Sequence, residues 1–169
     1  MKGIGILRGA LLWGALLVSA PLLAADAGVQ DFVSRASAAG LANIDAAKMA
    51  LSKSRSADVK TFAVHLIDDN TKTNVQLKTL AESRRLQLAE GPDEAGRARL
   101  QELQARQDDF DAAFADSQVR AQEEALQLFS EAAEQAGDED VRQFAQNNLA
   151  VLRLHLQMAR QLAEAHGAG

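Results

Sequence analysis

The sequence predicts an all-α protein, and three observations carry this prediction. Aromatic residues make up only 4% of the 169 residues, whereas strands favour aromatic and β-branched side chains. No proline occurs after Pro92, so the second half of the chain has no helix breaker of this kind. Apolar residues recur at spacings of three and four, and no alternating pattern is long enough to predict a strand.

The first segment has the composition of an export signal. Lys2 and Arg8 precede an apolar run over residues 9–18, and small residues follow up to Ala25. The run is short for a membrane span. We therefore expect a cleaved signal peptide over residues 1–25 and no membrane span after cleavage; an uncleaved anchor is the alternative. The expected location is the periplasm, with secretion or association with the outer membrane as further alternatives.

The expected helical domain covers residues 26–166, and its first two helices form a hairpin. The first helix is expected from about Gly28 to Ser52. Ser56 is positioned to cap the second helix, which is expected to end near Ala89. Each helix has an apolar stripe to bury, because its apolar residues fall on one side. The stripes include Phe32, Ala36, Ala39, Ala47 and Ala50 in the first helix and Val59, Phe62, Leu66, Leu77 and Leu80 in the second.

A longer connection, over residues 90–107, precedes the second hairpin and contains a short amphipathic helix. Asp108 or Asp109 is positioned to cap the third long helix, and Asp138 the fourth. We expect residues 167–169 to form a disordered tail. The stripes of the last two helices include Phe110, Phe114, Ala121, Ala125, Leu128, Val141, Phe144, Leu152, Ala159 and Leu162.

Four amphipathic helices must pack together to bury their stripes, and a four-helix bundle is the smallest arrangement that does so. The connections are short, long and short. This order favours the ferritin-like four-helix bundle, in which two antiparallel hairpins are joined by a crossover with a short extra helix. An up-and-down bundle with a decorated middle loop is the alternative.

Four polar residues interrupt the apolar stripes near the middle of the long helices. They are Asn43, Asn70, Gln122 and His155. Mid-helix positions meet at one level whichever way the helices run, so we expect one buried polar layer across the bundle. Three amides and one imidazole form a weak set of metal ligands. The pattern therefore favours a buried hydrogen-bond network that sets the helix register over a metal centre.

Composition and motifs restrict the possible functions. The chain has no cysteine, which excludes disulfides, thiolate metal sites and cysteine nucleophiles. The formal net charge of −5 argues against nucleic-acid binding. No nucleophile elbow, phosphate loop or HExxH helix occurs. We therefore expect no catalytic residue, no metal and no cofactor, and we expect a non-enzymatic interaction or stress-associated protein that binds an unidentified protein partner in the cell envelope.

Short segments occur in a fixed order between Phe32 and about Leu162: AGLANI at 39–44, VKTFA at 59–63, IDDNT at 67–71, FDAAF at 110–114 and LRLHL at 152–156. Their order and spacing resemble those of the domain-of-unknown-function family DUF4142. Members of this family are exported bacterial proteins, often described as outer-membrane or membrane proteins. The resemblance implies a ferritin-like helical fold and carries no established activity.

The resemblance also implies which residues relatives have at the four positions of the polar layer. In the family pattern, Glu is usual at the position of Asn43, and His is common at that of Gln122. Asn70 replaces the His of an Asp-His pair, of which Asp69 is the Asp. His155 matches a His of the pattern. The resemblance thus implies a Glu/His bundle site in relatives and, as the alternative function here, a ferritin-like metal-binding or oxidoreductase protein with a degenerate or lost metal site.

Overall fold

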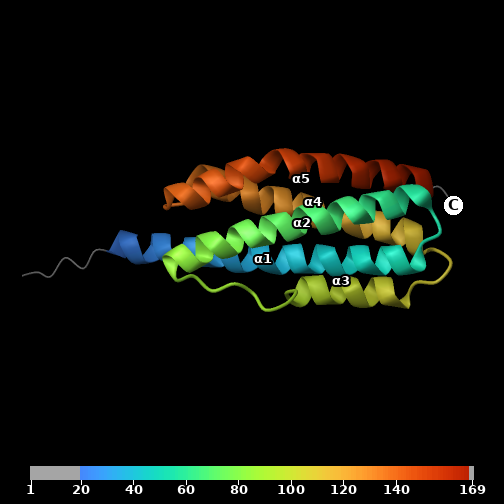
Figure 1. Cartoon of the computed structure of the whole chain (residues 1–169), viewed down its shortest axis with the longest axis horizontal. Coiled ribbons are helices and arrows are strands. Elements are labelled where there is room, and N and C mark those ends of the chain that lie inside the picture. Colours follow the sequence, from blue (N-terminus) through green and yellow to red (C-terminus); the bar gives the residue numbers. More distant parts are fainter. Residues whose placement is uncertain (1–19, 168–169) are drawn as a thin grey trace, which may run out of the picture.

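The computed structural model describes residues 20–167, with side chains from Ala27 onward. This part of the chain forms five helices and no strand (Figure 1), which confirms the all-α prediction. None of the described helices is both long and apolar enough to cross a membrane. The helices are α1 (Ala20–Lys53), α2 (Ala57–Arg84), α3 (Glu94–Ala105), α4 (Phe110–Gln135) and α5 (Glu139–His166).

Two predicted segments at the ends of the chain fall largely outside the described residues. Residues 1–19 of the expected signal peptide and residues 168–169 of the expected tail are not described. Residues 20–25, the remainder of the expected signal peptide, belong to α1. The helix therefore begins at Ala20 rather than near Gly28.

The end of α2 also differs from the prediction, since the helix stops at Arg84 and not near Ala89. Arg85 has a left-handed backbone conformation, with φ 57° and ψ 34°. The backbone N–H of Leu86 then donates to the carbonyl of Ala81 over 2.9 Å. This closure satisfies the last carbonyls of the helix and turns the chain out of it.

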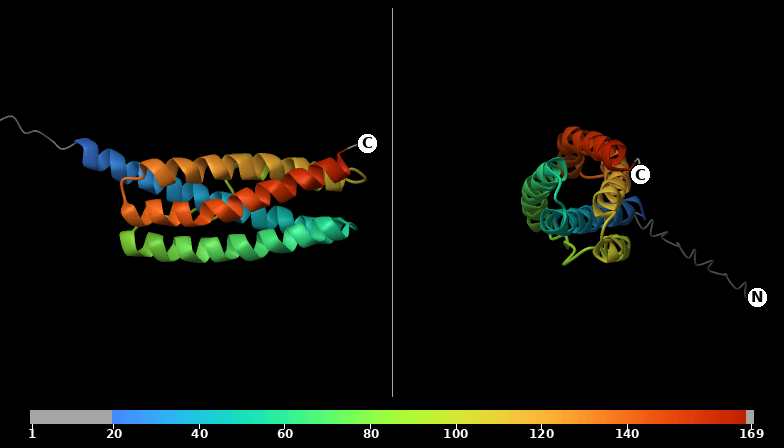
Figure 2. Two further views of the ribbon diagram at one scale, coloured as in Figure 1. Left: turned by 90° about the horizontal axis from the view of Figure 1, so that it is seen from above. Right: turned by 90° about the vertical axis from the view of Figure 1, so that its right-hand side faces the viewer.

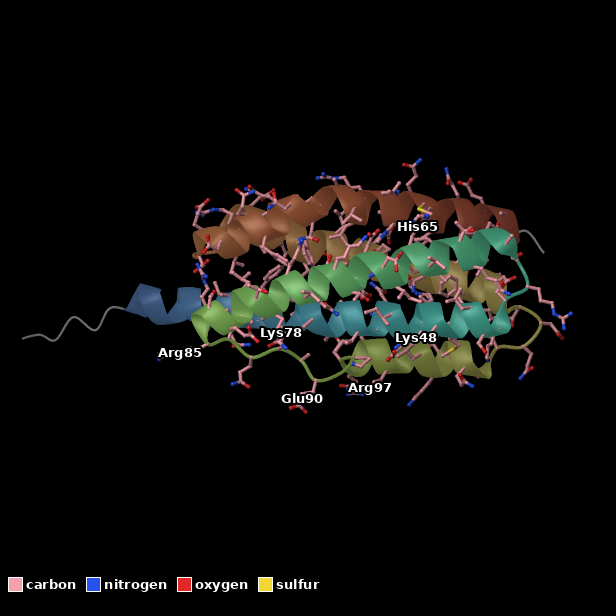
Figure 3. All side chains as sticks on the ribbon, viewed as in Figure 1. Lys48, His65, Lys78, Arg85, Glu90 and Arg97 are labelled. Carbon is pink, nitrogen blue, oxygen red and sulfur yellow. The ribbon has the colours of Figure 1, made fainter. Side chains whose placement is uncertain are left out.

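The four long helices lie side by side and α3 lies outside them (Figure 2). The end-on view places α2 and α4 on opposite corners, and α1 and α5 on the other two. Helices α1 and α5 run in one direction and α2 and α4 in the other (Figure 1). Labelled charged side chains such as Lys48, Lys78 and Arg97 point outward from the helices (Figure 3).

The buried apolar residues form two clusters, one towards each end of the bundle. In the first, the rings of Phe32 and Phe129 meet edge to face, with centroids 5.2 Å apart. In the second, the rings of Phe62 and Phe114 meet in the same way at 6.2 Å. Burying side chains of this size provides the main stabilisation of the bundle, about 1.5–3 kcal/mol each.

The short helix α3 is fastened to the outside of α1 and α4. Leu103 is only 2% exposed and belongs to the second apolar cluster. Gly96 lies so close to α1 that an added Cβ would be 3.0 Å from the Cβ of Ala42. At the other end, the ammonium of Lys53 donates to the carbonyls of Gln104 and Arg106 over 2.6 and 3.1 Å. The lysine thus satisfies carbonyls that the end of α3 leaves free.

Candidate functional site

Polar residues lie between the two apolar clusters on all four long helices. Asn43, Gln122 and His155 are buried, with 4%, 0% and 2% of their surface exposed. Asn70 departs from the expected burial because it is only half-buried. Its Nδ2 donates to the carbonyl of Leu66 on its own helix over 2.8 Å, so its amide is paired within α2.

The central contact of this region joins α5 to α2. Nε2 of His155 lies 3.0 Å from Oδ2 of Asp69. The other carboxylate oxygen of Asp69 is 3.6 Å from the ammonium of Lys72, and the Asp69 side chain is 30% exposed. A neutral imidazole that donates from Nε2 to the carboxylate leaves Nδ1 as a bare acceptor. Nδ1 of His155 is buried and has no hydrogen-bond partner among the described residues.

Burial sets the protonation of His155. Removal from water lowers the pKa of His155, and the nearby His65 acts in the same direction. The hydrogen bond and the charge of Asp69 act in the opposite direction and offset only part of this effect. The lowered pKa favours a neutral imidazole at neutral pH, and the bond to Asp69 orients its ring.

The remaining polar residues form separate pairs rather than one network through the four predicted positions. Nε2 of Gln122 donates to Oε1 of Gln118 over 3.3 Å, one turn earlier on α4. The hydroxyl of Thr73 donates to Oδ1 of Asn148 over 3.0 Å and so forms a second link between α2 and α5. Within the described part of the chain, no hydrogen bond joins any two of the four predicted side chains.

A small central cavity brings three of the four predicted residues together. Asn43, Asn70 and His155 line it, whereas Gln122 does not. Its volume is about 20 Å³, which is room for about one water molecule. The other polar residues of its wall are Asp69, Thr73, Asn74 and Asn148.

Five polar residues of this region were not in the predicted layer: Asp69, Thr73, Asn74, Gln118 and Asn148. Asn148 and Gln118 had a signal in the sequence, because each lies one or two turns from a predicted residue on the same helix. Thr73 had the same kind of signal, because it lies one turn from Asn70 on the inward side of its helix. Asp69 reaches the site across the contact between α2 and α5, and its participation depends on how the two helices are rotated, which periodicity along one helix does not specify.

A much larger hollow lies on the surface beside this cavity, between the C-terminal half of α2 and the N-terminal half of α5. Its volume is about 610 Å³, within the range of about 300–1,000 Å³ that small-molecule ligand pockets occupy. We call it the α2–α5 groove. It is lined by Asp69, Lys72, Thr73, Gln76, Thr79, Leu80, Ser83 and Arg84 of α2 and by Asp140, Gln143, Phe144, Asn147, Asn148 and Val151 of α5. Asp69, Thr73, Asn148 and Val151 belong to both hollows.

Ion pairs close the outer end of the α2–α5 groove. Arg84 at the end of α2 contacts both Asp138 and Asp140 at the start of α5. Its hydrogen bonds to Asp138 and Asp140 raise the pKa of Arg84. Asp138 also caps α5, accepting from the backbone N–H groups of Asp140 and Val141 over 2.9 and 3.0 Å. One guanidinium thus contacts two carboxylates at this end of the groove.

Metal ligands are scarce in this region. Among residues 27–167, no group of three or more His, Asp and Glu side chains is placed to hold a metal ion. The central cavity presents one imidazole and one carboxylate, from His155 and Asp69, and otherwise amide and hydroxyl groups. Tight transition-metal sites in proteins use three or four imidazole, thiolate or carboxylate ligands.

Comparison with protein families gives a match over most of the chain. The profile of the family described as Domain of unknown function (DUF4142) matches residues 18–162, which is most of the chain. The chain belongs to the DUF4142 family. The match includes every helix from α1 to most of α5, and with it the contacts of His155 with Asp69 and of Thr73 with Asn148. No protein of curated function and no solved structure matches this DUF4142 chain.

Proposed function

We propose that this DUF4142 chain is an exported, non-enzymatic protein of the cell envelope that binds a protein partner in the α2–α5 groove. The observation that carries the proposal is the lining of this groove. Uncharged amides from Gln76, Gln143 and Asn147 stand along its two sides, and the apolar side chains of Leu80 and Val151 are half-buried between them. A surface of this composition suits protein recognition, where an apolar centre is surrounded by polar groups.

The hydroxyl groups of the groove already donate hydrogen bonds within the protein, and this supports a non-enzymatic role. Within the groove, Thr79 and Ser83 donate to carbonyls of their own helix, and Thr73 donates to Asn148. A nucleophilic hydroxyl needs a base within hydrogen-bond reach. The buried imidazole beside the groove, His155, is 2% exposed and bonded to Asp69. The groove thus lacks a nucleophile paired with a base among its described residues.

Export is supported by the sequence of the first 25 residues, with its two cations, short apolar run and terminal small residues. The test is the intact mass of the protein recovered from the periplasm. A mass that lacks residues 1–24 or 1–25 is expected, and a mass that includes them would contradict cleavage.

The helix directions support a finer fold proposal, the ferritin-like topology. Helices α2 and α4 run the same way, and residues 85–109, with α3, connect the end of one to the start of the other (Figure 1). A connection that crosses the length of the bundle between two antiparallel hairpins defines this topology. An experimental structure in which α2 and α4 run in opposite directions would contradict it.

The alternative function, a metal-binding or oxidoreductase protein with a degenerate site, has one observation in its favour. His155, Asp69 and Asn43 meet at the central cavity. The direct check is metal analysis of protein purified without chelators. Stoichiometric iron, manganese or zinc that disappears in His155→Ala would favour this alternative over a partner-binding role.

Partner binding is tested with two arginine substitutions on α5. Asn147 lines the α2–α5 groove, and Gln157 is also exposed on the same helix but does not line the groove. We expect partner recovery from envelope extracts to fall with Asn147→Arg and to stay at the wild-type level with Gln157→Arg. Equal recovery with both variants would contradict binding in the groove.

A further inference from the structure

Two buried acceptor atoms belong to residues that line the central cavity and have no hydrogen-bond donor among the described residues. They are Nδ1 of His155 on α5 and Oδ1 of Asn74 on α2. Buried polar atoms of proteins are nearly always paired, either with protein groups or with ordered water. Two unpaired acceptors at one cavity therefore indicate a hydrogen-bond donor that binds inside it.

The contact of His155 with Asp69 makes Nδ1 an acceptor. A carboxylate only accepts hydrogen bonds, so Nε2, which lies 3.0 Å from Oδ2 of Asp69, carries the ring proton. The other nitrogen of a neutral imidazole then has a lone pair and no proton. Burial lowers the pKa of His155 and so disfavours a second proton on the ring. Nδ1 therefore needs a donor from another group.

The acceptor of Asn74 is positioned by the close approach of α1 to α2. A Cβ added to Gly40 of α1 would lie 2.5 Å from Oδ1 and 2.9 Å from Nδ2 of Asn74. The amide of Asn74 thus occupies the space that a side chain at position 40 would need. Gly40 lines the same cavity. The amide therefore packs against α1 at the cavity wall and does not extend into solvent.

The cavity suits a water molecule both in size and in the chemistry of its wall. A volume of about 20 Å³ holds about one water and excludes ligands with several non-hydrogen atoms. Buried waters typically make about three hydrogen bonds. Besides the two acceptors, the wall includes the amide of Asn43 on α1, a residue that is 4% exposed. An amide both donates and accepts, so it can serve as the third partner.

The charges around the cavity favour a neutral occupant over a cation. Asp69 provides the carboxylate of the described wall, and this group already contacts Nε2 of His155 over 3.0 Å and the ammonium of Lys72 over 3.6 Å. A cation would have to compete with these contacts or rely on amide oxygens and a single ring nitrogen, which form a weak ligand set. A water donates to both acceptors and leaves the net charge unchanged.

We propose that the central cavity binds one ordered water molecule, which donates to Nδ1 of His155 and Oδ1 of Asn74 and contacts the amide of Asn43. The water thereby joins α5, α2 and α1, whereas the direct contact between His155 and Asp69 joins only two helices. The cavity shares part of its wall with the α2–α5 groove, so the water can exchange with solvent on that side. The inference goes beyond the proposed function and does not depend on it.

The first test is a high-resolution crystal structure of the wild-type protein. We expect one water peak about 2.5–3.2 Å from both Nδ1 of His155 and Oδ1 of Asn74. A protein group that donates directly to Nδ1, or a cavity without density, would overturn the proposal. An ion about 2.0–2.1 Å from Nδ1 would also overturn it, because that is the distance of a metal ligand.

The second test follows the water in solution with two matched variants on α2. Leucine has the branched shape of asparagine and no polar atom. Asn74→Leu removes one of the two acceptors, whereas Asn70→Leu keeps both, because the amide of Asn70 donates to the carbonyl of Leu66 on its own helix. Magnetisation transfer from long-lived water to the ring protons of His155 is the readout.

We expect this transfer in the wild type and in Asn70→Leu, and its loss in Asn74→Leu. Loss in both variants or in neither would overturn the proposal. If Asn74→Leu does not fold, the wild-type protein still decides, through the crystal structure and through the presence or absence of the transfer to His155.

Discussion

The two outer seams of the bundle are held together by different chemistry. Between α1 and α4, helix α3 adds the buried Leu103, and the apolar core continues beneath it. Between α2 and α5, the described side-chain hydrogen bonds are polar links at four levels: His166 to Asp58, His155 to Asp69, Thr73 to Asn148, and Arg84 to the two aspartates at the start of α5. The seam between α2 and α5 therefore has an open surface. Its side-chain contacts can be weakened by a change in protonation or by a competing polar group.

Truncation of Leu103, the buried side chain with which α3 packs on the bundle, should have the largest effect on stability. Leu103→Ala is expected to lower the free energy of unfolding by about 2–5 kcal/mol, because it leaves a cavity beneath a fully packed helix. The matched change on the other seam is Leu80→Ala, where the side chain is half-buried at the groove. Denaturant unfolding should show a much smaller loss for Leu80→Ala. Equal losses would show that the two seams are packed alike.

The contact between His155 and Asp69 should appear as a coupling energy between the two residues. In a double-mutant cycle of Asp69→Ala and His155→Leu, we expect the two changes to cost less together than separately, with a coupling of about 0.5–3 kcal/mol. The control cycle pairs Asn70→Ala with His155→Leu. It should be nearly additive, because Asn70 bonds to the carbonyl of Leu66 on its own helix. A larger coupling in the control cycle would instead support the predicted network.

Acid should weaken the fold through His155. Burial lowers the pKa of this imidazole in the folded state, so the unfolded chain, with a pKa of about 6.5, takes up the proton first. The contribution is therefore fully present above about pH 6.5 and is lost as the pH falls from there towards the lower pKa of the folded state. Denaturant midpoints at pH 8 and pH 5 measure the loss, and His155→Leu should reduce it. An identical pH response in that variant would exclude His155 as its source.

The smallest expected effect on stability is that of Asn147→Arg. The side chain is exposed on α5, so the free energy of unfolding should change by no more than about 0.5 kcal/mol. Thermal unfolding beside Gln157→Arg checks this. A loss of several kcal/mol confined to Asn147→Arg would mean that Asn147 supports the fold, and reduced partner recovery would then have a structural cause.

The sequence predicted the helices better than the contacts between them. Spacings of three and four identified all four long helices, and Asp138 caps the last of them as expected. Two boundaries were wrong. The start of α1 overlaps the expected signal peptide, and the left-handed conformation of Arg85 ends α2 early. Both differences arise at helix ends, where the apolar pattern carries little information.

The candidate site was predicted only in part, for a similar reason. The pattern identified His155 and Asn43 because each interrupts an apolar stripe, and both line the central cavity. It did not identify Asp69 as the partner of His155, since that pairing depends on the rotation of α2 against α5. Leu80 and Phe144 of the α2–α5 groove belong to the predicted apolar stripes, but the groove itself depends on the same relation between the two helices.

The most direct test of the account compares the two seams in living cells. A photo-crosslinking residue is placed at Gln76 or Asn147 in the groove and, as controls, at Gln101 or Glu102 on the exposed side of α3. We predict one discrete protein adduct from both groove positions. Adducts that form equally from the α3 positions, or from those positions alone, would contradict the claim that the α2–α5 groove is the binding surface.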